Sequence, residues 1–138
     1  MYNQEDLNPV LAHDLKDETL MKLVTVSGEG AKISVTLIVE GLVVYGDIIS
    51  GGVYCDEMLK KLNQDAGDPK PIGALREYFQ SLKDSFYSES DGSRIKPFYL
   101  HLENYSFLTG NGNRLISEND ILRVSIQKVS AFSLGRPA

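Results

Sequence analysis

Residues 32–49 restrict the fold of this chain more than any other stretch, because two alternating apolar segments meet there at a glycine. The first segment has apolar residues at Ile33, Val35, Leu37 and Val39, and the second has them at Leu42, Val44 and Ile48. A period of two places such side chains on one face of a strand. Since Glu40-Gly41 lies between the segments, the sequence predicts a β-hairpin with Gly41 in its tight turn.

Two further glycines, Gly46 and Gly51, interrupt the second segment or follow it. Glycine weakens the interior of a strand, so Gly46 predicts a site where the strand bends or another backbone approaches closely. Gly51 is interpreted as the exit from the strand into a helix. The stretches SGEGAK (27–32) and TGNGN (109–113) lack the spacing and the strand-to-helix context of a phosphate-binding loop. Turn glycines explain both stretches better.

Three segments have the spacing of helices. Asn8-Pro9 and Asp17 are typical helix starts and Gly28 is a typical end, which predicts helix over about 9–27, interrupted near Lys16. After Gly51-Gly52, one apolar stripe contains Cys55, Met58, Leu59 and Leu62, and a second contains Leu75, Tyr78, Phe79, Leu82 and Phe86. A proline- and glycine-rich connector, 64–73, separates them. We expect a two-helix insertion over about 53–87. The amphipathic stripe of its second helix could dock a partner or a membrane, but packing on the sheet of the same chain is favoured, because a short helix needs tertiary contacts.

The C-terminal third returns to strand patterns, first in FYLHLENYSFL and then in LRVSIQKVSAFSL. In the second pattern the alternation changes phase, which predicts a break near Gln127-Lys128. Strict alternation turns a set of mostly aromatic side chains away from the core: Ile38, Tyr45, Tyr99 and Tyr105, with His101 on the same strand face as Glu103. Either the 53–87 helices cover this set, or it forms an exposed patch that binds a protein partner.

Composition excludes several classes of function. The 138 residues fit one domain (1–138), and the net charge of −5, with Lys and Arg scattered, argues against nucleic-acid and anionic membrane surfaces. No apolar run is long enough to span a bilayer. The single cysteine, Cys55, cannot form an internal disulfide, and the N-terminal residues are acidic and polar, so we expect a cytoplasmic protein and a helix-core role for this thiol.

No residue cluster predicts catalysis. His101 and Glu103 form a pair of the kind used in acid–base chemistry, but nothing in the sequence implies a pocket around them. Ligands for a metal ion are too few, and no cofactor motif is present. The expected fold is α+β, with a strongly bent antiparallel sheet or a small Sm/SH3-like barrel, an N-terminal helix and the helical insertion. A non-enzymatic interaction protein is the expected function.

The order of motifs resembles one known family. ISVTLIVEGLVVYGDIISGGVYCDEMLKKL, FYLHLENYSFLTGNG and LRVSIQKVSAFSLG are similar to successive segments of the gas vesicle accessory protein GvpU family, over most of residues 17–135. The resemblance implies a cytoplasmic protein, free or associated with gas vesicles, that assists their formation or modulates their association. It implies protein partners, namely gas vesicle shell or accessory proteins. It supplies no catalytic residues. Open sheet edges would also allow a homo-oligomer.

A second resemblance gives the alternative hypothesis. The initial helix followed by VTLIVEGLVVYGDI is similar to the opening of Sm-like barrels, which bind RNA. The Asp-x-x-x-Asn loop and the Arg-Gly loop of those proteins have no clear counterparts here. At the position after Ile126, the sequence has Gln127-Lys128 and not Arg-Gly. An Sm-like nucleic-acid-binding module is therefore the alternative to the gas vesicle accessory protein.

Overall fold

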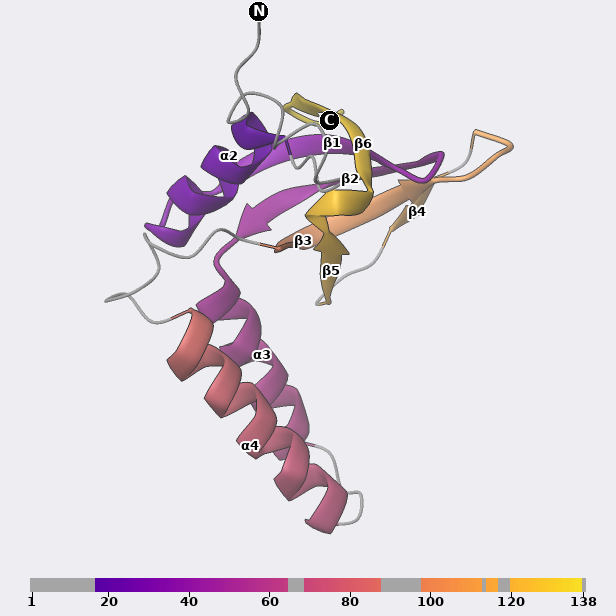
Figure 1. Cartoon of the computed structure of the whole chain (residues 1–138). Helices are drawn as coiled ribbons and strands as arrows, with labels where there is room; N and C mark the ends of the chain where they lie inside the picture. The colour runs from indigo at the N-terminus through magenta and orange to yellow at the C-terminus, as the bar shows by residue number, and fades with distance from the viewer. Residues whose placement is uncertain (1–16, 65–68, 88–97, 113, 117–119, 138) are drawn as a thin grey trace, which may run out of the picture.

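A computed structural model describes residues 17–64, 69–87, 98–112, 114–116 and 120–137, and these residues form an α+β fold with one antiparallel sheet. The helices are α2 (Glu18–Gly28), α3 (Gly51–Gln64) and α4 (Pro69–Phe86). The strands are β1 (Ile33–Val39), β2 (Leu42–Ile49), β3 (Tyr99–Leu108), β4 (Arg114–Ile116), β5 (Ile121–Ser125) and β6 (Val129–Leu134), with a 3-10 turn, η1 (Ile126–Lys128), between the last two (Figure 1).

The predicted β1–β2 hairpin is confirmed. Its strands pair in antiparallel register from Ile33 opposite Ile48 to Val39 opposite Leu42. The two turn residues, Glu40 and Gly41, have φ values of 51° and 84°. A two-residue hairpin turn with positive φ at both central positions matches the right-handed twist of the strands, and glycine adopts it without strain.

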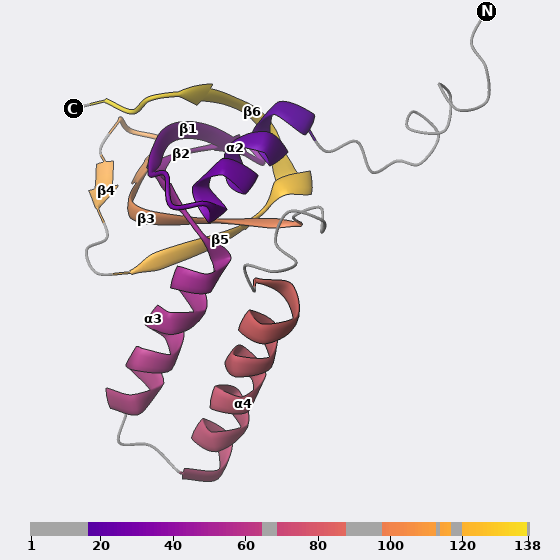
Figure 2. The ribbon, with the colours of Figure 1, turned by 90° about the vertical axis from the view of Figure 1, so that its left-hand side faces the viewer.

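The sheet must be strongly curved because of how its last two strands are joined. The order is β4-β3-β2-β1-β6, with β5 also pairing with β3. In a flat sheet, β5 and β6 would lie roughly 19 Å apart, across four strand spacings, but the three residues of η1 rise only about 6 Å. Figure 2 shows the sheet curling around α2. The break predicted near Gln127-Lys128 is thus confirmed as η1. The sheet is not closed, so the Sm/SH3-like barrel is not confirmed.

The core lies on the concave side of the sheet and is closed by α2. Leu20 of α2 is buried there, together with Ile126 of η1 and with alternating apolar residues of the strands, namely Val35, Leu37, Val44, Ile48, Leu100, Leu102 and Val124. Asp17 caps α2, because its side chain accepts a hydrogen bond from the Leu20 N–H at 3.1 Å. The predicted cap and the end at Gly28 are confirmed, while the helix expected over 9–16 lies outside the described residues.

Gly46 lies where the Leu102 side chain of β3 approaches β2 closely. A Cβ atom added to Gly46 would lie 2.9 Å from the Leu102 Cβ, which confirms the predicted close approach. The pairing passes directly from Tyr45 opposite Ser106 to Asp47 opposite Glu103, so β3 has an irregularity opposite Gly46. Asn104 sits at this irregularity with φ of 49°. It is a β-bulge, and it reverses the facing of the residues that follow.

Helices α3 and α4 form an antiparallel hairpin that extends away from the sheet (Figures 1 and 2). The expectation that the second helix packs on the sheet is therefore wrong, and no residue of α4 is buried. The helix also begins earlier than expected, at Pro69, inside the predicted connector. Proline is tolerated in a first helical turn, where the N–H has no partner within the helix. Strand β4 was not predicted from the sequence pattern.

Candidate functional site

The five residues predicted to bind a partner do not form one surface. Ile38 and Tyr45 lie on the convex face near the β1–β2 turn, whereas Tyr99 and His101 lie at the base of the α3–α4 hairpin. Tyr105 packs against the core, on the side opposite to the one predicted. The Asn104 bulge explains this error, because one extra residue shifts the phase of the alternation.

An apolar patch occupies the convex face near the β1–β2 turn. Two neighbouring rows of the sheet form this outer patch. Ile38, Val43 and Leu108 pair in one row, and in the other Tyr45 and Ile116 both pair with Ser106, which is buried between them. Ile38 is 38% exposed and Ile116 is 69% exposed. The Arg114 guanidinium lies over the Tyr45 ring, 5.4 Å from its centroid. The patch thus combines aliphatic and aromatic surface with a cation at its rim, a composition typical of protein interfaces.

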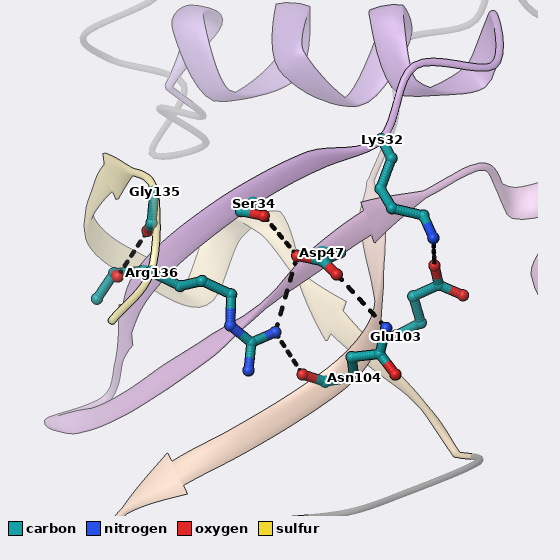
Figure 3. A network of polar contacts seen from close by, with 8 residues as sticks. Lys32, Ser34, Asp47, Glu103, Asn104, Gly135 and Arg136 are labelled. Carbon is teal, nitrogen blue, oxygen red and sulfur yellow. Dashed lines mark hydrogen bonds and ion pairs between the residues drawn. The ribbon is translucent and has the colours of Figure 1, made fainter. Parts of the chain in front are cut away.

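Between the outer patch and the His101 end of the sheet, the convex face of β1, β2 and β3 is polar and centred on Asp47 (Figure 3). Ser34 donates a hydrogen bond to Asp47 at 2.6 Å, and Arg136 lies 3.7 Å from the same carboxylate oxygen. Arg136 also donates to the backbone carbonyl of Asn104. Lys32 pairs with Glu103 at 2.5 Å, and this pairing raises the pKa of the lysine. Because its charges are already paired, this polar half offers little to a new partner.

A cluster of rings joins the α3–α4 hairpin to the sheet. His101 of β3 is only 2% exposed, because Tyr54 of α3 stacks on it with a centroid separation of 4.2 Å and Tyr87 meets it edge-on at 5.7 Å. The Tyr87 ring in turn lies against Gly51, where an added Cβ would come within 2.3 Å of it. Gly51 therefore follows the strand, as predicted, and its lack of a side chain also leaves room for the Tyr87 ring.

Arg123 of β5 completes this joint, which consists of Gly51, Tyr54, Tyr87, Tyr99, His101 and Arg123. Its guanidinium lies 4.0 Å from the Tyr99 ring centroid and 3.3 Å from the His101 Nε2 atom. Burial, together with this cation, lowers the pKa of His101 to about 3. Burial raises the pKa of Tyr87. His101 is thus a neutral structural side chain at physiological pH. No sequence spacing pointed to Arg123, since its partners come from distant segments.

Cys55 is fully buried, as predicted for a helix-core residue. Burial raises its thiol pKa to about 11, which makes it a poor nucleophile. A pocket of about 250 Å³ opens on the concave side, lined mainly by apolar residues of β2, β3 and β5, with the Glu40–Lys128 ion pair at its rim. Among the described residues, no three His, Cys, Asp or Glu side chains lie close enough together to hold a metal ion.

These features define a small α+β protein that presents an apolar patch on a curved sheet and a projecting helical hairpin. Within the described part of the chain, no helix is both long enough and apolar enough to cross a membrane. Comparison with family models matches residues 17–137 to the family described as gas vesicle protein GvpU-like. The chain belongs to this GvpU-like family, which confirms the resemblance of its motifs. No curated protein and no solved structure matches the chain.

Proposed function

We propose that this protein is a non-enzymatic accessory protein of gas vesicles, which assists their formation or modulates their association by binding a shell or accessory protein. Membership of the GvpU-like family supports the setting. The outer patch carries the proposal, because it leaves large apolar side chains such as Ile116 exposed on the sheet. A contiguous apolar surface of this kind marks a contact site for another protein.

The charges of the described residues favour a protein partner over RNA. Three cations near the sheet are already paired with carboxylates: Lys32 with Glu103, Lys128 with Glu40, and Arg136 with Asp47. A phosphate backbone binds clustered Lys and Arg side chains that are free to release counterions. With a net charge of −5 as well, the alternative of an Sm-like RNA-binding module has little support.

Flotation with gas vesicles tests the proposal. A tagged copy of the chain is expressed in a host that makes gas vesicles, the floating vesicles are washed, and the bound chain is quantified. Two adjacent residues of β4 provide a matched pair, because Ile116 pairs with Ser106 on the convex face whereas Leu115 pairs with Phe107, which packs against the core. Their exposed fractions are similar, 69% and 61%.

We expect the wild-type chain to be recovered in the floating layer. The bound amount of Ile116→Glu should fall about tenfold or more, because a charge in an apolar contact costs more than about 1.4 kcal/mol. The bound amount of Leu115→Glu should not change. A wild-type chain that stays out of the floating layer, and binds no isolated shell or accessory protein, would refute the proposed function. Equal binding of the two variants would show that the outer patch is not the contact surface.

A further inference from the structure

No described residue covers one apolar side of the α3–α4 hairpin. Leu75 and Tyr78 of α4 are 44% and 56% exposed, and no residue of this 18-residue helix is buried. With Leu82, which is half-buried, they follow spacings of three and four residues and so lie on one side of the helix. Phe79 contacts α3 instead, since its ring meets Tyr54 edge-on at 6.0 Å. Part of the apolar stripe therefore holds the hairpin together, and part remains open.

The other side of the hairpin is polar. Lys83 of α4 pairs with Asp56 of α3 at 2.6 Å, and Gln80 donates a hydrogen bond to Asp84 at 3.1 Å. At 3.6 residues per turn, Lys83 is about 140° around the helix from Tyr78. A helical hairpin with one apolar and one polar side has the pattern of half of a four-helix bundle.

We propose that the open side of the hairpin, formed by Leu75, Tyr78 and Leu82, packs against the same side of a second copy of this chain, giving an antiparallel four-helix bundle with α4 against α4. The charge of the hairpin suits self-association. Its two helices contain five basic and four acidic residues, whereas the whole chain has a net charge of −5. An antiparallel arrangement also places the two sheets at opposite ends of the bundle, where they do not clash.

The available area is sufficient for a weak to moderate dimer. Helix α4 is about 27 Å long at 1.5 Å per residue, and two packed helices are roughly 20 Å wide. The contact then covers on the order of 500 Å² per copy, or about 1,000 Å² in total, near the lower limit for a specific interface. A two-fold axis through the middle of α4 places Tyr78 next to its own counterpart.

Sedimentation of the purified chain, without gas vesicles, tests this proposal separately from the proposed function. We expect the wild-type chain to reach twice its monomer mass as its concentration rises from about 1 to 200 μM. Tyr78→Glu should weaken the dimer about a hundredfold, because each dimer contains the change twice. Gln80→Glu adds the same charge to the same helix on its polar side and should leave the dimer unchanged.

Cross-linking supplies a second measurement that does not depend on a destabilising charge. Tyr78→Cys should form a disulfide-linked dimer under mild oxidation, while Gln80→Cys should not; the native Cys55 is fully buried. A wild-type chain that remains monomeric up to 200 μM overturns the proposal. The proposal is also overturned if Tyr78→Glu dimerises as tightly as the wild type and Tyr78→Cys forms no disulfide-linked dimer.

Discussion

The buried His101 predicts an acid sensitivity with a defined sign. Burial, assisted by Arg123, lowers its pKa in the folded chain to about 3, whereas a histidine in an unfolded chain titrates near ~6.5. Below pH ~6.5 the unfolded state therefore binds a proton that the folded state does not accept until the pH falls toward 3. The stability that depends on neutral His101 is complete above pH ~6.5 and is lost progressively between pH ~6.5 and 3.

The size of the effect follows from this difference in proton binding. Over most of this range the free energy of unfolding should fall by about 1.4 kcal/mol per pH unit, which amounts to about 2 kcal/mol between pH 7.5 and 5.0. Urea denaturation followed by far-UV circular dichroism at several pH values measures it. His101→Gln should be less stable at pH 7.5, because the ring stack with Tyr54 is lost, but its stability should depend less on pH by the same ~2 kcal/mol.

The chain contains one other histidine, His13, and His13→Gln is the matched control. Carboxylates contribute equally to the pH dependence of the wild-type chain and both variants, so the difference between His101→Gln and the wild type isolates the joint. If the wild type and His101→Gln lose stability in parallel as the pH falls, His101 does not cause the acid sensitivity. An imidazole pKa near 6.5 for His101, measured by NMR titration of the folded chain, would contradict its burial as a neutral ring directly.

Three further predictions concern the close contacts in the fold. Gly46→Val should lower the free energy of unfolding by about 1–3 kcal/mol in urea denaturation. In the double variant with Leu102→Ala, the loss should be smaller than the sum of the two single losses by at least ~0.5 kcal/mol. A loss equal to that sum would contradict the contact. Gly51→Ala should displace the Tyr87 ring and raise the His101 pKa measured by NMR, so an unchanged pKa would count against the joint. The Cys55 thiol should react with a disulfide reagent at pH 8 at least about 100-fold more slowly in the folded chain than in urea, since its thiolate fraction is that much lower; equal rates would refute its burial.

Local chemistry made the central part of the fold predictable. The β1–β2 hairpin follows from a period of two on each side of Glu40-Gly41, and the cap of α2 follows from Asp17 before an apolar stripe. Each of these features depends on residues within about fifteen positions of one another. The close approach at Gly46 was also predictable in kind, because a glycine inside an apolar strand usually marks a bend or a closely approaching neighbour.

Features that depend on distant segments were not predictable. Nothing in YLHLENYSFL indicates that Asn104 starts a bulge, and this single residue turns Tyr105 toward the core. The joint at His101 brings together side chains from α3, the end of α4, β3 and β5, so no sequence spacing reveals it. The outer patch was predicted only in part, through Ile38 and Tyr45, because its remaining members include a residue of the unpredicted β4.

The polar half of the sheet explains why the helical hairpin does not cover the convex face. A helix laid across β1, β2 and β3 there would bury the exposed Lys32–Glu103 pair and the rest of the Arg136–Asp47 pair, and desolvating such charges costs several kcal/mol per ion unless every partner is kept. The apolar stripe of α4 would gain no apolar neighbour in return. Anchoring at His101 avoids that cost, because the ring stack is the part of the convex face that tolerates burial. The hairpin is thereby held at its base and left uncovered along its length, so its open side and the outer patch form two separate surfaces on one small protein.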